Sequence, residues 1–239
     1  MVYKFLYYGE QCIINNHKMN INEVEKMKET HTYTKNEEVA HAITHGIGVL
    51  LSIAGLVLLI VFSSMKGNPW QIVSVTIFGV TMLLMYLCST IVHSLPNGKW
   101  KNIFQIFDHS SIYLFIAGTY TPFLLVHLRG TVGWTLFGII WGIAIIGIVF
   151  KVFFVKKFLF LSTVFYILMG WLIILVWEPL TLIMDGSGVR LLVLGGIFYT
   201  VGAIFYVWRS FPYHHAVWHL FVLAGSVFHF FSIFHYVII

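Results

Sequence analysis

The chain has 239 residues, of which 59% are hydrophobic and only 10% are charged. A soluble domain carries about 25% charged residues because it must present a hydrated surface, so the mean hydropathy of +0.88 excludes a typical water-soluble protein. The formal charge of +5 comes from basic residues scattered singly among the predicted connections, and this pattern argues against a nucleic-acid partner. Membrane lipids are therefore the expected surroundings of most of the chain.

The N-terminal segment, residues 1–36, is polar and mixed in charge, and it contains no continuous apolar stripe. A segment of this composition buries too little apolar surface to fold by itself, so we expect a cytosolic tail that is partly helical at most and largely flexible. Residues 37–239 are expected to form one membrane domain, because the connections within it are too short to hold a soluble domain.

Apolar segments follow at regular spacing along the membrane domain. A helix needs about 20 residues to cross the hydrocarbon core of a bilayer, and turn-forming or charged residues separate seven segments of about this length. The predicted spans are residues 41–63, 70–94, 104–127, 132–150, 158–178, 190–208 and 214–237. The sequence thus predicts an all-α integral membrane protein, a seven-transmembrane helix bundle that crosses the cell (plasma) membrane as a multi-pass protein.

Lysine and arginine in the short connections predict the orientation of the bundle, because cytosolic connections carry an excess of both. If the N-terminus is inside, the inner side has nine of these residues, including Lys26, Lys28 and Lys35 of the tail, and the outer side has three. We therefore predict that the N-terminus is in and the C-terminus is out.

Polar and ionisable side chains of the predicted spans gather at one end of the bundle. An aspartate at the centre of a spanning helix costs about 2.5–3.5 kcal/mol on insertion scales, so the positions of such residues are informative. In the predicted orientation, the start of span one, the end of span two and the starts of spans three and seven all lie on the cytosolic side. These four helix ends carry Glu37, Glu38, His41, His45, Ser89, His93, Asp108, His109, His214, His215 and His219.

The spacing of these residues is typical of a zinc site. His215 and His219 are four residues apart, which puts both imidazoles on one face of a helix, and Ser89 and His93 repeat this spacing on span two. Two such histidines and a third from another helix form the ligand set of a catalytic zinc, in which water takes the fourth position. Asp108, at the mouth of span three, is placed to hydrogen-bond that water or to orient a ligand imidazole.

Other interpretations of single residues stay open. His41 and His45 have the same spacing and form a rival ligand pair; otherwise they cap span one or support the ligands by hydrogen bonds. A single histidine near a membrane interface is usually an amphipathic anchor. This is the interpretation for three further histidines, His127, His229 and His235. Glu178 and Asp185, at the opposite end, are expected to be solvated loop residues.

Three blocks of the sequence resemble the hemolysin III branch of the progestin and adipoQ receptor (PAQR) family. The first runs from Glu38 through Thr44-His45-Gly46-Ile47-Gly48, the second combines Ser89-Thr90-Ile91-Val92-His93 with Phe107-Asp108-His109-Ser110, and the third is His215-Ala216-Val217-Trp218-His219. Their order, spacing and placement on the spans agree with the family from about Glu37 to the C-terminus.

The resemblance implies a cytosol-facing zinc site, with His93, His215 and His219 as ligands and with Asp108 and Ser89 as partners of the water on the zinc. Bacterial members usually have Asn-x-x-Thr-His in the first block, whereas this chain has His41 at the asparagine position. That departure argues against His41 as a ligand and leaves its role open. The alkaline ceramidases look similar at the same five positions, which suggests hydrolysis of a lipid amide with Asp108 as the base and Ser89 as the group that stabilises the oxyanion.

Three functions are compatible with these features. The first is a zinc-dependent hydrolase of lipid amide or ester bonds that serves membrane lipid homeostasis, with membrane lipids as its substrates. The second is a cytolytic, pore-forming hemolysin, although a pore needs polar groups along its whole axis and the polar residues here are confined to one end. The third is a receptor-like protein whose zinc is structural. The sequence leaves enzymatic activity, substrate identity and oligomeric state open.

Overall fold

The computed structural model describes residues 6–8, 11–14, 17–20 and 33–238. It divides the chain into two compact units, Met1–Thr34 and Lys35–Ile239. The first unit contains three short strands, β1 (Leu6–Tyr8), β2 (Gln11–Ile14) and β3 (His17–Asn20). They pair antiparallel in the order β1-β2-β3, with Tyr7 opposite Cys12 and Ile13 opposite Lys18.

These strands lie where the composition predicts at most partial helix, so the secondary structure of residues 6–20 differs from the expectation. Adjacent strands that pair through their backbones need only short connections, and the polar composition of the segment does not reveal them. The other parts of the predicted tail up to residue 32 lie outside the described residues. The flexibility and the cytosolic location of the tail stay predictions.

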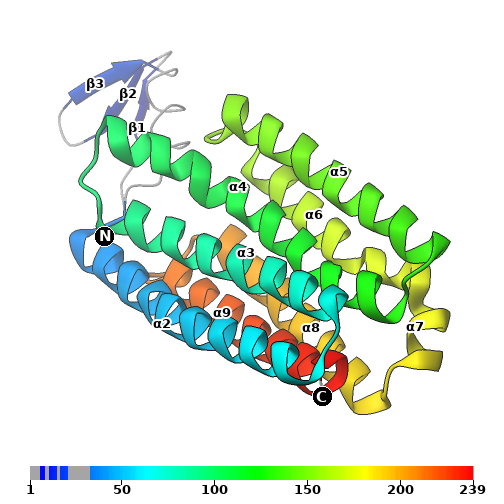
Figure 1. Cartoon of the computed structure of the whole chain (residues 1–239). Coiled ribbons are helices and arrows are strands. Elements are labelled where there is room, and N and C mark those ends of the chain that lie inside the picture. Colours follow the sequence, from blue (N-terminus) through cyan, green and yellow to red (C-terminus); the bar gives the residue numbers. More distant parts are fainter. Residues whose placement is uncertain (1–5, 9–10, 15–16, 21–32, 239) are drawn as a thin grey trace. The chain divides into compact units, whose positions relative to one another are not determined.

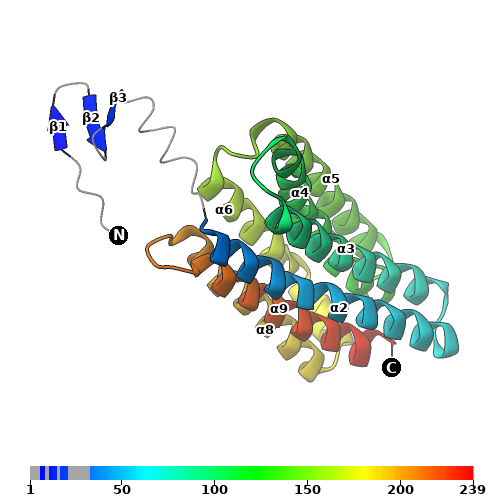
Figure 2. The same ribbon diagram turned by 90° about the vertical axis from the view of Figure 1, so that its left-hand side faces the viewer.

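The second unit is a bundle of long helices (Figures 1 and 2). Four are continuous, namely α2 (Lys35–Lys66), α3 (Pro69–Ser94), α5 (Thr131–Phe154) and α8 (Gly186–Val207). Two continue into a π-helical turn: α4 (Lys99–Pro122) into η1 (Phe123–His127) and α9 (His214–Ile233) into η3 (Phe234–Ile238). The remaining segment consists of α6 (Leu159–Gly170), the 3₁₀ turn η2 (Trp171–Val176) and α7 (Trp177–Ile183).

All seven predicted spans fall on these helices, so the all-α membrane bundle is confirmed. Within residues 33–238, six segments are long and apolar enough to cross a membrane. The seventh, α4, has a similar length but carries many polar side chains, which are buried inside the bundle; Ser110, Thr119 and Tyr120 are among them. The chain is a multi-pass membrane protein, and the side that each terminus faces stays a prediction.

Local sequence explains where two of the helices begin. Asn68 accepts hydrogen bonds from the backbone N–H groups of Trp70 and Gln71, and the Gln71 side chain accepts one from the Asn68 N–H. This reciprocal capping satisfies backbone donors that a helix start leaves without partners. Asp185 caps α8 by accepting from the Ser187 N–H, and this hydrogen bond lowers the pKa of its carboxyl group. Asp185 is exposed, in agreement with its predicted position in a solvated loop.

Helix α2 packs against both α3 and α9, and α4 packs against α3 and α5 (Figure 2). Gly48 permits the contact between α2 and α3, because a Cβ there would lie 2.4 Å from the Tyr86 ring. Large apolar side chains such as Phe153 (72% exposed) and Leu182 (79% exposed) point away from the bundle, as lipid contact requires. This packing places the starts of α2, α4 and α9 and the end of α3 at the same end of the bundle (Figure 1).

The fifth predicted span is interrupted at η2, near the middle of its length. The Tyr120 hydroxyl donates to the carbonyl groups of Met169 and Gly170, at 2.9 and 2.6 Å, and accepts from the Ile173 N–H at 2.9 Å. Irregular backbone at membrane depth is tolerated where protein groups satisfy it or where it lines a cavity. Tyr120 supplies this compensation from the neighbouring helix.

Candidate metal centre

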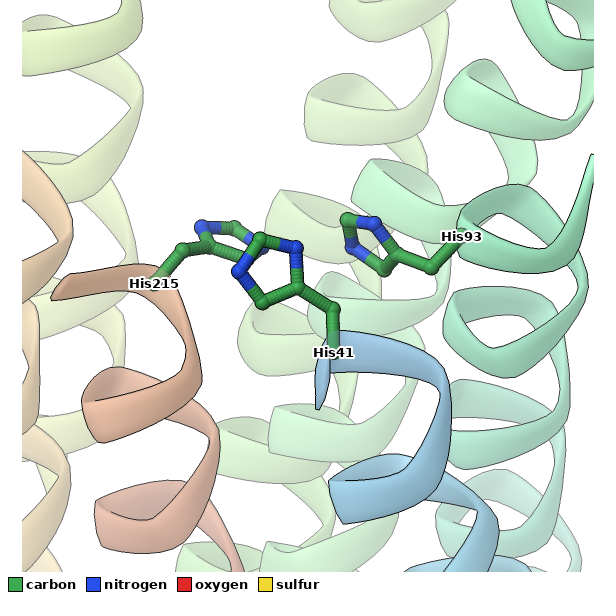
Figure 3. A group of neighbouring side chains, drawn as sticks. All are labelled: His41, His93 and His215. Carbon is green, nitrogen blue, oxygen red and sulfur yellow. The ribbon is translucent and has the colours of Figure 1, made fainter. Parts of the chain in front are cut away.

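Three histidines from three helices converge at the polar end of the bundle. His41 of α2, His93 of α3 and His215 of α9 each offer a ring nitrogen, and these three atoms all lie within 4.8 Å of one another. The rings point toward one another in Figure 3. Their centroids are 4.7–5.1 Å apart, and the side chains are almost entirely buried.

Two further histidines lie against this group. The His219 ring centroid is 4.6 Å from that of His215, 5.3 Å from that of His93 and 5.5 Å from that of His41. The His45 ring stacks on His219 with a centroid distance of 3.4 Å. Both residues are fully buried. We call these five residues, His41, His45, His93, His215 and His219, the histidine cluster.

A carboxylate from α2 fixes the orientation of His93. Glu38 Oε2 lies 2.7 Å from His93 Nδ1, and Lys101 donates from Nζ to Glu38 Oε1 at 2.7 Å. Since the carboxylate accepts, Nδ1 carries the proton and Nε2 keeps its lone pair. This is the arrangement by which a carboxylate orients a metal-ligating imidazole.

Backbone and hydroxyl groups of α2 hold His219 in the same way. Its Nδ1 lies 3.2 Å from the carbonyl oxygen of His41 and 3.0 Å from the Thr44 hydroxyl. The Thr44 hydroxyl donates its hydrogen to the carbonyl groups of Ala40 and His41, so it accepts from His219. Nδ1 therefore carries the proton. The other nitrogen, Nε2, is buried and has no hydrogen-bond partner within the described part of the chain.

The donor set fits a divalent metal that prefers nitrogen. Zinc binds imidazole at about 2.0–2.1 Å in a tetrahedral site, which separates two ligand nitrogens by about 3.4 Å. The upper limit of 4.8 Å for His41, His93 and His215 is compatible with closure on an ion by small side-chain rotations. His93 and His219 already present the unprotonated nitrogen that metal binding requires.

The structure shows the position of His41, whose role the sequence leaves open. The departure from the family pattern argues against this residue as a ligand, whereas its ring lies among the three that converge most closely. The reason is the helical phase of α2, which begins at Lys35 and turns His41 into the bundle, where its exposure is 0%. His41 is therefore a structural member of the cluster, next to His93, His215 and His219 of the predicted ligand set.

The predicted catalytic residues lie beside the cluster. Ser89 is one helical turn before His93 and is 1% exposed, and no described residue bonds its hydroxyl group. Asp108 is within electrostatic range of His93 and His45, and its carboxylate lies 3.3 Å from His109 Nδ1. The arrangement thus provides a buried hydroxyl group and a carboxylate close to the imidazoles.

Glu38, Lys101 and Thr44 contribute to the site although the sequence did not single out their roles. Glu38 and Thr44 belong to the first of the three blocks that resemble the family. Lys101 was used only in the lysine and arginine count that predicts the orientation of the bundle. Their contacts join residues 55, 63 and 175 positions apart in the sequence. The one available signal was the position of Glu38 at the same helix end as the histidines.

The expectation that His229 is an anchor at the membrane interface was wrong. His229 is 7% exposed inside the bundle. Its Nε2 lies 3.0 Å from the carbonyl oxygen of Leu192 in α8. His127 reaches the carbonyl oxygen of Tyr236 at 2.7 Å, and His235 is exposed. Position near a predicted span end therefore does not determine burial.

A cavity inside the bundle reaches two residues that contact the histidine cluster, although the five cluster histidines are not among its lining residues. Its volume is about 130 Å³, and its walls come from α3, α4, α6, α8 and α9. Tyr206 and Trp218 line it, and their ring centroids lie 5.7 and 4.8 Å from that of His215. Tyr120 and His229 line both this cavity and a neighbouring one of about 40 Å³. Most other lining residues are apolar.

The sequence of the chain is similar to those of several known proteins. The family model described as Haemolysin-III related matches residues 33–230. The chain is 58% identical to the Hemolysin-3 homolog of Bacillus subtilis (strain 168) over 204 residues, which cover 85% of this chain and 96% of the relative. It is 53% identical to the Hemolysin-3 of Bacillus cereus, with 90% of this chain and 97% of the relative covered. The human monocyte to macrophage differentiation factor is 27% identical, with 84% of each chain covered.

Proposed function

The chain belongs to the haemolysin III family, and from that premise we propose that it is a zinc-dependent hydrolase of lipid amide or ester bonds that serves membrane lipid homeostasis. The observation that carries this proposal is the histidine cluster, which contacts Tyr206 and Trp218 in the wall of a largely apolar cavity inside a membrane protein. A group of metal-ligating side chains therefore lies near a cavity that suits an aliphatic chain, as a lipid hydrolase requires.

In this proposal His93, His215 and His219 hold the zinc. His93 and His219 have their Nδ1 atoms tied to acceptors, which leaves Nε2 for the metal. His41 lies close enough to complete or exchange with this set. Zinc bound by imidazoles polarises a carbonyl group and lowers the pKa of water to about 7.

The chain itself supplies the remaining chemistry. Asp108 takes the proton of the attacking water and returns it to the departing amine or alcohol, because Glu38 is engaged by Lys101 and Glu37 by the Tyr213 N–H. Ser89 donates its hydroxyl hydrogen to the oxyanion that forms at the carbonyl group, which accounts for a buried hydroxyl with no bond to a described residue. The apolar cavity walls exclude water from the aliphatic part of the substrate.

The names of two relatives, Hemolysin-3 homolog and Hemolysin-3, favour cytolysis as a second candidate. A lytic pore needs polar groups along a continuous path through the membrane. The residues that line the cavity below the cluster are mostly aromatic and aliphatic, so the interior of one chain argues against this candidate. A pore that forms between several copies of the chain would not use this interior. A receptor with structural zinc would bind the metal but would not hydrolyse lipids.

The test is hydrolysis by the purified full chain in vesicles that contain a panel of lipid amides and esters, with released fatty acid measured by mass spectrometry. Asp108→Asn should lower the rate by about 10²–10⁴-fold, because the amide cannot take a proton, and should keep the zinc. Glu178→Gln, on the exposed surface of α7, is the matched control and should leave the rate unchanged. Full activity of Asp108→Asn, or no release from any lipid by the wild type, would contradict the proposal.

A comparison of whole-cell lipids in deletion and wild-type cells connects this activity to membrane homeostasis. An unchanged lipid composition would favour the receptor with structural zinc.

A further inference from the structure

The end of the cavity that is distant from the histidine cluster contains a buried histidine that no function described above uses. His229 lines both cavities and is 7% exposed. It follows His219 by ten residues on α9, which is about 15 Å along a helix axis. It is therefore too distant to take part in the metal centre.

The hydrogen bonds of His229 define its tautomer. Its Nε2 lies 3.0 Å from the carbonyl oxygen of Leu192. A carbonyl oxygen only accepts, so Nε2 carries the hydrogen. An imidazolium inside a spanning helix and without a carboxylate partner is costly, so the ring is neutral and Nδ1 is an acceptor. This atom is buried and has no hydrogen-bond partner among the residues that the structure describes.

The hydroxyl groups around the ring donate elsewhere. Thr119 donates to the Phe115 carbonyl, Thr200 to the Gly196 carbonyl and Tyr120 to the carbonyl groups at the break in the fifth span. The Tyr199 ring meets His229 edge to face at 5.2 Å, and its hydroxyl pairs with Ser226. Ser226 gives its own hydrogen to the Val222 carbonyl, so Tyr199 donates in their pair. Since each hydroxyl has one hydrogen, none of these four cavity-lining donors is left for Nδ1. A buried acceptor without a partner costs about 1–3 kcal/mol.

The position of the ring is built into α8. A Cβ at Gly195 would lie 2.1 Å from His229 Cδ2, so only glycine leaves room for the imidazole. The Leu192 carbonyl then fixes the ring orientation from the same helix. An acceptor that is buried, held in one orientation and part of a cavity wall is preorganised for a ligand that brings a hydrogen-bond donor.

We propose that this end of the cavity is a binding subsite for an aliphatic chain that carries a hydroxyl group, with His229 Nδ1 accepting the hydroxyl hydrogen. The surrounding walls are mostly apolar, which suits a hydrocarbon chain with a single neutral donor and not a cation, whose further donors would stay without partners. A chain that reaches from the metal centre to His229 would carry the hydroxyl at a distance from its reacting end. Only this orientation rests on the proposed function; the subsite itself requires neither zinc nor turnover.

The experiment uses two probes that differ only in the donor, 1-dodecanol and its methyl ether. Apparent dissociation constants are taken from the shift in unfolding temperature of the full chain in lipid nanodiscs over a range of probe concentrations. The wild type should bind the alcohol about three- to tenfold more tightly than the ether, which corresponds to one net hydrogen bond.

Matched variants assign the effect to the correct atom. His229→Gln retains a donor for Leu192 but removes the acceptor at Nδ1, so the preference for the alcohol should fall to about onefold. His229→Asn places an amide oxygen near Nδ1 and should keep the preference even if the fold is less stable. Thr119→Val, which removes another hydroxyl from the cavity wall, should also keep it.

Three results would overturn the subsite. These are equal affinities of the wild type for both probes, no binding of either probe, and a preference that survives His229→Gln but is lost in Thr119→Val. Because the readout is binding, failure of the hydrolase proposal leaves it intact, and failure of the subsite leaves the hydrolase proposal intact.

Discussion

The two halves of α9 contain the same residue type in opposite surroundings. In the first half, His215 and His219 face other imidazoles, with ring centroids 3.4–5.5 Å apart. In the second half, His229 has no histidine neighbour within the described residues; its contacts are a backbone carbonyl of α8 and the Tyr199 ring. Both halves bury their histidines in the bundle.

The difference shows that neighbours decide the chemistry of a buried histidine. Several neutral imidazoles that face one another bring lone pairs together, which is unfavourable without a cation and favourable with one. A single imidazole whose one nitrogen donates to a carbonyl is a neutral acceptor, which suits an uncharged donor. The first half of α9 is thus suited to a metal and the second half to an organic ligand.

The largest expected effect is all-or-none and concerns the orientation of α9, that is, which of its two ends lies on the cytosolic side of the membrane. The excess of lysine and arginine predicts that the histidine cluster faces the cytosol and that the C-terminus is outside. Alkaline phosphatase fused after Ile239 should be active, and green fluorescent protein at the same position should be dark. Fluorescence with an inactive phosphatase would reverse the orientation and place the cluster outside.

The next largest effect is expected at Glu38. This carboxylate orients His93, which faces the two histidines in the first half of α9, and the second half has no such contact among the described residues. Glu38→Gln should weaken zinc binding by about 10–100-fold, because a neutral amide is a poorer acceptor for His93 Nδ1–H. Competition with a chelator measures this affinity.

Glu37→Gln is the control for Glu38→Gln. The Glu37 carboxylate accepts from the Tyr213 N–H at 3.1 Å, and the amide oxygen can accept the same bond, so we expect zinc affinity close to that of the wild type. Equal losses in both variants would show that general charge near the cluster acts, and not the contact with His93.

A smaller effect is expected for His41→Asn, a variant that tests whether His41 is one of the metal ligands. If His93, His215 and His219 are the ligands, this variant should keep the zinc with an affinity reduced by less than about tenfold, because three imidazoles suffice for a catalytic site. Zinc content after extensive dialysis measures it. Complete loss of zinc, together with its retention in His219→Ala, would assign the ligand role to His41.

The sequence predicted the spans well because hydropathy over about 20 residues reports directly on the lipid environment. It also predicted which helix ends meet, because alternating orientation and the positions of polar residues are sufficient for that. It left the role of His41 open and did not predict that His229 is buried, since both depend on helical phase relative to neighbouring helices. The break at Gly170 was not predicted, because it rests on hydrogen bonds from Tyr120 in another helix.

The strands at residues 6–20 and the contact between Glu38 and Lys101 were missed for a related reason. Both depend on pairing between segments, which composition and periodicity do not encode. The roles of Asp108 and Ser89 stay predictions: the structure brings both residues beside the imidazoles, but their chemistry depends on a bound metal and a substrate.

The zinc content of the purified full chain tests the central claim most directly. Mass spectrometric metal analysis should find about one zinc per chain in the wild type, and a large loss in His93→Ala and in the double variant His215→Ala/His219→Ala. Both should also unfold at a lower temperature than the wild type, because bound metal stabilises the folded state by mass action. His235→Ala, in the second half of the same segment and exposed, should retain the metal. A wild-type protein without zinc, or variants of the cluster that keep it in full, would contradict the metal centre.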